Sequence, residues 1–223
     1  IDTYMAVFRS SVPILDFAWN SVKVTFSVTA GQLITCSMAG FAFARLRFPF
    51  RNLLFVLLLA SLMVPGQVTI IPVFIIMRRL GLVDNHLSII LPFLTSAFGV
   101  FLLRQFFLTL PQELIDAAKI DGANFWTIYL RVALPLSGPA LAALTILTFN
   151  GTWNNYFYPL IFLNTWEKMT LPLGITALRG YLASNSASVI MAAVSLAIFP
   201  VLLIFLVAQS WFIEGVTRSG IKG

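Results

Sequence analysis

Long hydrophobic runs dominate the chain and predict five membrane-spanning helices. A helix needs about 20 apolar residues to cross a bilayer. Polar and charged residues gather between the runs instead of recurring along one face of each. The predicted spans cover residues 20–44, 53–77, 87–103, 135–163 and 188–213.

The composition agrees with a membrane protein and excludes an ordinary soluble domain. Hydrophobic residues make up 59% of the chain and charged residues only 10%, whereas a soluble domain carries about 25% charged residues. The net charge of +6 could indicate nucleic-acid binding, but the basic residues flank apolar runs and form no stripe. We therefore predict an all-α, polytopic helical protein, one transmembrane domain over residues 1–223, with membrane lipid as a partner and no nucleic acid.

Basic residues between the spans predict an orientation. Cytoplasmic loops of membrane proteins are enriched in Lys and Arg. One set of loops holds eight basic residues and the other side holds six, so we expect the N-terminus outside and the C-terminus in the cytoplasm. The eight are Arg45, Arg47, Arg51, Arg104, Lys119, Arg131, Arg218 and Lys222, and the six are Arg9, Lys23, Arg78, Arg79, Lys168 and Arg179.

Proline and glycine interrupt several of the runs. Pro65-Gly66 breaks the second span, Ser137-Gly138-Pro139 opens the fourth, and Pro200 lies in the fifth. Broken backbone at membrane depth is tolerated where it packs in protein or lines a water-filled cavity. The breaks favour a transport path over a simple anchor, although both residue types are common in membrane helices.

The segment over residues 105–135 carries the strongest functional signal. Pro111 suits the start of a short helix, and Glu113 and Asp116 place negative charge near the positive end of its dipole. Gly122 predicts a left-handed residue that ends this helix. The helix should span about 12–15 Å at 1.5 Å per residue.

A second short helix should follow directly. Asn124 can cap its start, and Pro135 is expected to terminate it. Ala117 and Ala118 give the first helix a thin profile together with Gly122. Such a two-helix projection is suited to docking into a groove of another protein.

The spacing within this segment resembles a known family. Asp116-Ala117-Ala118, Gly122 and then Val132, Leu134 and Pro135 are similar to the EAA loop of bacterial ABC importer permeases, whose pattern is Glu-Ala-Ala, Gly and Ile-x-Leu-Pro. Asp for Glu keeps the charge, and Val for Ile keeps the β-branch. The resemblance implies contact with an ATPase subunit by Glu113, Asp116, Ala117, Ala118, Asp121, Gly122, Leu134 and Pro135.

Further segments resemble the maltose-type, carbohydrate branch of that family. The branch usually has six spans, so a further helix is expected before Ile1. It also implies a multi-pass protein of the bacterial cytoplasmic (inner) membrane. The segments are Asn20-Ser21, Ala42-Phe43-Ala44-Arg45, the stretch from Phe101 to Phe107, Trp153-Asn154-Asn155-Tyr156 and Gly220-Ile221-Lys222-Gly223.

The resemblance also implies a division of labour among subunits. A second, homologous permease would complete the translocation path, two ATP-binding subunits would hydrolyse ATP, and an extracytoplasmic solute-binding protein would deliver the solute. The chain has no G-x-x-x-x-G-K-[ST] loop that could cradle a triphosphate. We therefore expect no cofactor on this chain, ATP and magnesium at the partner subunits, and no enzyme activity of its own.

Polar residues inside apolar runs are candidates for the translocation path. Buried amides are costly unless they find partners or line a cavity. One hypothesis places them on the path, where amides bind hydroxyl groups and an indole stacks on a sugar. The alternative is that they form interhelical hydrogen bonds. The residues are Gln67, Asn150, Trp153, Asn154 and Asn155.

Two rival functions fit the sequence less well. A secondary transporter predicts ionisable residues within the spans, and none occurs in residues 24–44, 53–77 or 132–166. An intramembrane enzyme needs a nucleophile with a base, or a metal cluster, and the chain has one His and one Cys. We expect no catalytic and no metal site. The expected solute is a carbohydrate, with a glycerol phosphodiester as the alternative.

Overall fold

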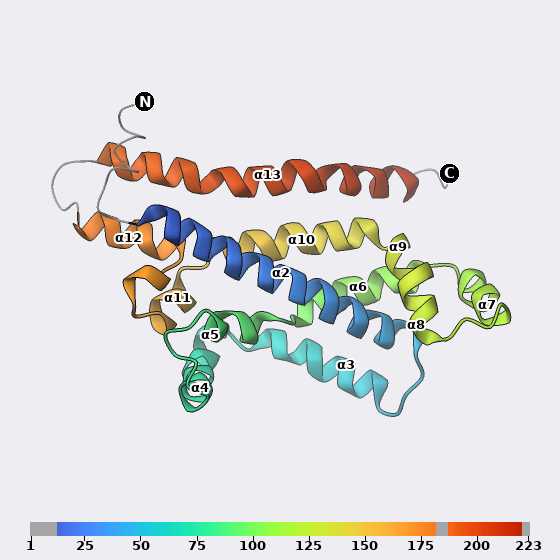
Figure 1. Ribbon diagram of the computed structural model, residues 1–223. Helices are drawn as coiled ribbons and strands as arrows, with labels where there is room; N and C mark the ends of the chain where they lie inside the picture. The colour runs from blue at the N-terminus through green and yellow to red at the C-terminus, as the bar shows by residue number, and fades with distance from the viewer. Residues whose placement is uncertain (1–12, 182–186, 220–223) are drawn as a thin grey trace. The chain divides into compact units, whose positions relative to one another are not determined.

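The computed structural model describes residues 13–181 and 187–219. Every regular element among them is a helix, which confirms the predicted all-α fold (Figure 1). The predictions for Arg9 and for the segment Gly220-Ile221-Lys222-Gly223 lie outside the described residues, as do those for the side chain of Arg179 and for the side chains from 208 onward.

Three helices are long and apolar enough to cross a membrane: Ile14–Arg45, Leu87–Thr109 and Ile190–Val207. The first is α2, and the last lies within α13 (Ala187–Ser219). Two further spans are added if each bent pair of helices is counted as one span. The pairs are Arg51–Met63 with Gly66–Arg79 and Phe125–Leu136 with Gly138–Trp153. Counted in this way, the described residues hold up to the five spans that the sequence predicts.

Shorter helices make up the bent and interrupted spans. The second predicted span consists of α3 (Arg51–Ala60), η1 (Ser61–Met63) and α4 (Gly66–Arg79), and it breaks at Pro65 as predicted. The third consists of α5 (Leu87–Ile90), η2 (Leu91–Phe93) and α6 (Ala97–Thr109). The remaining elements are α7 (Gln112–Ile120), α8 (Phe125–Ile128), η3 (Tyr129–Ala133), α9 (Leu134–Leu136), α10 (Gly138–Trp153), α11 (Phe157–Phe162), η4 (Trp166–Lys168) and α12 (Leu171–Tyr181).

The chain divides into two compact units. One unit comprises the residues up to Thr29, Gln67–Phe93 and Thr148–Leu206, with cores around Phe17 and Phe162. The other comprises Ala30–Gly66, Leu94–Leu147 and the residues from Val207, with one core that includes Phe41. The prediction of one transmembrane domain over the whole chain stays a prediction.

The backbone groups between η2 and α6 form hydrogen bonds with side chains of α2. Thr35 Oγ1 donates to Leu94 O at 2.6 Å, and Cys36 Sγ accepts from Ser96 N at 3.4 Å. Ser96 then caps α6, because its Oγ accepts from Gly99 N at 2.9 Å. Hydrogen bonds from a neighbouring helix are what allow a break at membrane depth.

The fourth predicted span ends differently from expectation. Residues 135–163 do not form one helix, since α10 ends at Trp153 and α11 begins at Phe157. Asn154 Nδ2 turns back to Asn150 O at 2.9 Å, and Asn155 Oδ1 accepts from Tyr158 N at 3.2 Å. Both amides thus compete with the helical backbone, as asparagine commonly does.

The third span ends later than predicted, and the fifth is more continuous than predicted. Residues 105–109 continue α6, so the predicted segment over 105–135 leaves its span only at Leu110. The helix α13 runs through Pro200 without a break. Proline removes one helical hydrogen bond but does not always interrupt a membrane helix.

Candidate functional site

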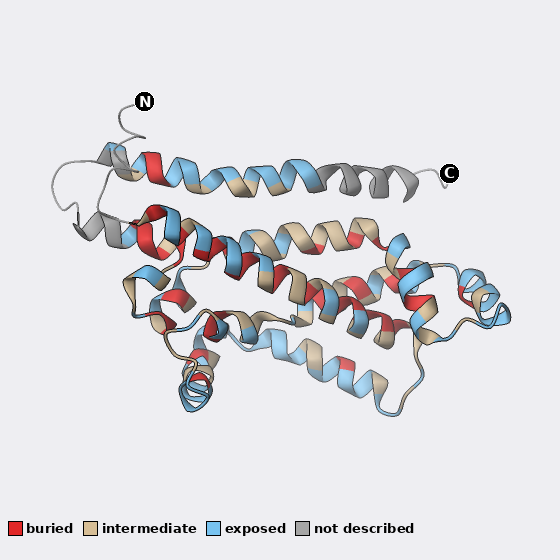
Figure 2. Cartoon of the chain, viewed as in Figure 1, coloured by how far each residue is buried: buried red, intermediate tan, exposed pale blue. Residues whose placement is uncertain are grey.

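The helix α7 lies at one end of its unit and is largely exposed (Figures 1 and 2). Only Ile115 is buried among its nine residues, and it packs in the core that contains Ile128 and Tyr129. Ile120, at the end of α7, is 86% exposed. One apolar residue thus anchors the helix while another is uncovered at its tip.

The end of α7 is closed by a Schellman motif. Gly122 has φ +79°, and a Cβ at this position would meet nothing within 4 Å. Its N–H donates to Lys119 O at 3.0 Å, and Ala123 N donates to Ala118 O at 2.9 Å. These two bonds pair the carbonyl groups of Lys119 and Ala118 near the end of the helix. The positive φ confirms the predicted left-handed residue at Gly122.

The start of α7 is fastened to the end of α2 by Arg45. Its guanidinium donates to Phe107 O through Nη2 at 2.6 Å and through Nε at 3.0 Å. It also donates to Leu110 O and, at 2.6 Å, to Gln112 Oε1. A single planar cation therefore holds the connection between α6 and α7, which is a geometry that Arg provides and Lys does not.

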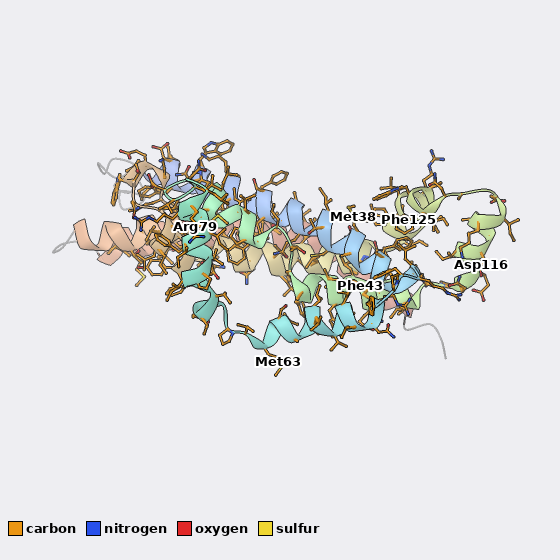
Figure 3. All side chains as sticks on the ribbon, turned by 90° about the horizontal axis from the view of Figure 1, so that it is seen from below. Met38, Phe43, Met63, Arg79, Asp116 and Phe125 are labelled. Atoms are coloured by element: carbon orange, nitrogen blue, oxygen red, sulfur yellow. The ribbon has the colours of Figure 1, made fainter. Side chains whose placement is uncertain are left out.

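Asp116 continues this chain of contacts along the exposed face of α7. Gln112 Nε2 donates to Asp116 Oδ1 at 3.0 Å, and Lys119 Nζ forms an ion pair with the same oxygen at 3.1 Å. The hydrogen bond from Lys119, followed by that from Gln112, lowers the pKa of Asp116. The carboxylate is charged and open to solvent. Figure 3 shows it on α7, beyond Phe125 on α8.

The second short helix begins as predicted and ends later. Asn124 Oδ1 accepts from Thr127 N at 2.9 Å and caps α8. Pro135 does not terminate the helix, which continues to Leu136 before a bend of 75° ahead of α10. The π-helical turn η3 precedes Pro135, and such a turn relieves the clash between a proline ring and the preceding carbonyl groups.

The root of the second helix is held by a buried hydrogen bond. The hydroxyl groups of Tyr129 and Ser37 lie 2.7 Å apart, between η3 and α2. Phe41 of α2 packs against Phe125 and Tyr129, with ring centroids 5.2 Å and 5.4 Å apart. The two short helices are therefore tied to α2 at both ends of the segment, by Arg45 and by Tyr129.

The predicted coupling residues fall into two groups. Most are exposed, while Ala118 and Leu134 are half-buried and pack against the chain's own core, so Ala118 faces outward less than expected. A role in coupling remains a prediction for all of them. The exposed members are Glu113, Asp116, Ala117, Asp121, Gly122 and Pro135.

Arg45, Gln112 and Tyr129 did not figure among the predicted site residues. Arg45 lies at the end of an apolar run, where it was predicted to be a topology signal and part of a segment that resembles the carbohydrate branch. Nothing in the sequence signals its partners, because Gln112 lies 67 positions away. Only the tertiary arrangement brings these side chains together.

The predicted path residues do not share one environment. Trp153 is 2% exposed, its ring stacks on Phe149, and its Nε1 donates to Ala197 O at 2.9 Å. This favours the packing alternative for Trp153. Asn150 and Asn154 are exposed and bonded to each other at 2.9 Å, and Gln67 is exposed on α4. Asn155 is half-buried, and path lining stays a prediction for all five residues.

A second polar cluster lies in the other unit, around Asp84. This carboxylate accepts hydrogen bonds from Asn164 N and Thr165 N, each at 2.8 Å, from the Thr165 hydroxyl and from Lys168 Nζ at 2.8 Å. The Lys168 ammonium and the Thr165 groups hold the pKa of Asp84 far below its usual range. His86 bonds Lys168 O at 2.9 Å, and burial lowers its pKa. The Asp84 cluster thus joins the connection between α4 and α5 to the segment between α11 and α12.

The sequence of the chain matches a known protein family. The family described as "Binding-protein-dependent transport system inner membrane component" matches residues 36–218. The arabinooligosaccharides transport system permease protein AraQ of Bacillus subtilis is 38% identical, over 100% of this chain and 79% of that protein. AraQ of Halalkalibacterium halodurans is 36% identical, over 100% of this chain and 80% of that protein.

Two further similarities extend the comparison. The sn-glycerol-3-phosphate transport system permease protein UgpE of Yersinia enterocolitica is 35% identical, over 97% of this chain and 77% of that protein. A chain of a bacterial ABC transporter involved in the import of the acidic polysaccharide alginate has a TM-score of 0.82 and 28% identity, over 94% of this chain and 79% of that one. The chain belongs to the inner membrane components of binding-protein-dependent transport systems and is an ABC importer permease.

Proposed function

We propose that this permease forms half of a translocation path and that α7 couples it to an ATP-binding partner. The observation that carries the proposal is the uncovered tip of α7. The Schellman motif at Gly122 closes its C-terminal end, yet Ile120 remains 86% exposed. Leu114 on the same helix is 43% exposed and Trp126 on α8 is 52% exposed, so the segment leaves several large apolar side chains uncovered, as on a surface that a partner covers.

The proposed partners follow from the family and from this surface. A second permease would complete the path, two ATP-binding subunits would carry ATP and magnesium, and a solute-binding protein would deliver the solute from outside. ATP binding would draw the two ATPase subunits together and shift the permease between inward-facing and outward-facing states. The Arg45 contacts would carry the displacement of α7 to α2.

The proposed orientation places α7 in the cytoplasm. The charge bias of the loops supports it, and it puts the turn between α2 and α3 at the cytoplasmic surface as well, since Arg45 joins α2 to α7. The N-terminal end of this chain would then lie outside and the C-terminal end in the cytoplasm.

The proposed solute is a carbohydrate, as the names of the AraQ relatives suggest. Residues 132–166 carry no basic side chain, whereas Asn150 and Asn154 present exposed amides that suit hydroxyl groups. A glycerol phosphate compound is the second candidate, because UgpE is also similar. Uptake of labelled oligosaccharide and glycerol phosphodiester into proteoliposomes distinguishes the two.

A substitution at Gly122 tests the coupling proposal. Gly122→Asn keeps the left-handed backbone, since Asn tolerates it, and its Cβ meets nothing within 4 Å. We expect co-purification of the ATP-binding subunit to weaken about fivefold or more, because a clash at a packed interface costs about 1–3 kcal/mol.

The chain supplies a matched control in Gly81. It also has a positive φ, +68°, and open space around the Cβ position, but it follows α4. Gly81→Asn should leave assembly and solute-stimulated ATPase unchanged. Equal assembly of the Gly122→Asn and Gly81→Asn proteins, with normal uptake, would show that α7 is only a connector.

A further inference from the structure

The turn between α2 and α3 forms a hollow that the coupling role does not use. Its volume is about 460 Å³. The hollow is basic and carries no acidic side chain. It is lined by Arg47, Phe48, Phe50, Arg51, Asn52 and Leu53.

Among the residues that the structure describes, no acidic side chain forms an ion pair with the two arginines of the hollow. The ion pairs among the described residues are Lys119–Asp116 and Lys168–Asp84, and neither involves Arg47 or Arg51. Arg51 Nη1 donates to Leu46 O at 3.0 Å, which holds this guanidinium beside the turn. Its remaining N–H groups, and those of the exposed Arg47, stay available to an anion.

The hollow continues into an apolar surface. Phe50 is 73% exposed at its rim, and Leu53 and Leu57 are 55% and 57% exposed along α3 (Figure 2). The turn joins two elements of membrane spans, so it lies where lipid headgroups meet acyl chains. A phospholipid offers both a phosphate for the arginines and chains for this face, whereas a soluble anion offers only the first.

We propose that Arg47 and Arg51 bind the headgroup phosphate of an anionic glycerophospholipid, with its acyl chains along α3. Guanidinium groups match phosphate oxygens in a bidentate manner, and basic pockets between membrane helices are suited to such headgroups. The site depends only on membrane embedding and not on the identity of the solute or on the contact made by α7.

The test uses the assembled transporter in phosphatidylcholine vesicles that contain a photoactivatable phosphatidylglycerol. Crosslinking followed by peptide mapping should label residues 47–53, and unlabelled phosphatidylglycerol should compete while phosphatidylcholine should not. The double variant Arg47→Gln, Arg51→Gln should lose about 25-fold in labelling, at about fivefold for each charge near the membrane surface.

Three comparisons make the result decisive. The double Lys variant keeps the charge and should retain labelling within about fivefold. Arg78→Gln, Arg79→Gln removes two exposed cations elsewhere and should leave this peptide labelled as in the parent. Equal labelling in the double Gln variant, equal competition by phosphatidylcholine, or displacement by inorganic phosphate would each overturn the proposal.

Discussion

The Arg45 guanidinium donates a hydrogen bond of 2.6 Å to the side-chain oxygen of Gln112, and so joins the last residue of α2 to the first residue of α7. The same cation holds two backbone carbonyls, Phe107 O and Leu110 O. Gln112 passes the contact on to Asp116. A membrane-spanning helix and the exposed helix thus share one continuous set of polar contacts.

Loss of this link should uncouple transport from ATP hydrolysis. Arg45→Ala removes hydrogen bonds from a charged group, worth about 1.5–3 kcal/mol each, so α7 should leave its position about tenfold more often or more. We expect solute taken up per ATP hydrolysed to fall, as measured in proteoliposomes. Arg131→Ala, at an exposed position in the same segment, should leave this ratio of solute to ATP unchanged. An unchanged ratio in Arg45→Ala would show that the link is not needed.

The Ser37–Tyr129 contact should stabilise the unit that carries α7. Tyr129 is 5% exposed, so Tyr129→Phe should cost about 1 kcal/mol in the free energy of unfolding, through loss of one buried hydrogen bond. The measurement is the melting temperature in detergent. Tyr156→Phe is the control, because that residue is 39% exposed. If Ser37→Ala and Tyr129→Phe were fully additive, the two hydroxyls would contribute independently.

Substitutions in α10 should separate path lining from packing. Trp153→Phe keeps an aromatic ring beside Phe149 and loses the bond to Ala197 O, so we expect lower thermal stability by about 1 kcal/mol and an unchanged KM for uptake. Asn150→Leu should instead raise KM, because the amide is exposed. The reverse outcome would place Trp153, and not Asn150, against the solute.

The Asp84 cluster should make the unit sensitive to acid. The pKa of Asp84 lies far below its ordinary value of about 3.9, so its stabilisation is fully present above about pH 5 and declines as the pH falls below about 4. Asp84→Asn should lower the melting temperature at neutral pH and flatten its decline in acid, and Asn tolerates the φ of +60° at this position.

The control for acid sensitivity is Asp121→Asn, since Asp121 makes no ion pair among the described residues. Its melting temperature should follow the parent at every pH. An identical acid decline in the parent and in Asp84→Asn would mean that other carboxylates limit stability.

Local chemistry explains which features the sequence predicted. Gly122, Asn124 and Pro65 act on neighbouring backbone groups, so their effects could be inferred from a few adjacent residues. The apolar runs predicted the spans for the same reason. The candidate coupling segment was found because its turn and cap residues lie close together in sequence.

Tertiary contacts account for what the sequence did not predict. Arg45 meets partners 62 to 67 positions away, and Ser37 meets Tyr129 across 92 positions.

Other features that the sequence did not predict are local. Asn154 and Asn155 end α10 because their amides bond to nearby backbone, although an apolar run continues past them. The helix α12 was missed, since residues 171–181 are too short for a span and lie next to residues that gave no periodic signal.

Cys36, which accepts a hydrogen bond from Ser96 N at the break before α6, is buried. This burial has a practical consequence. It is the single cysteine of these 223 residues and is 0% exposed. A buried thiol reacts poorly with water-soluble reagents, whereas an exposed one reacts readily. Arg131→Cys, at an exposed position of the same segment, would therefore carry a spectroscopic label selectively, so that the movement of this segment during turnover can be followed without removing the native cysteine.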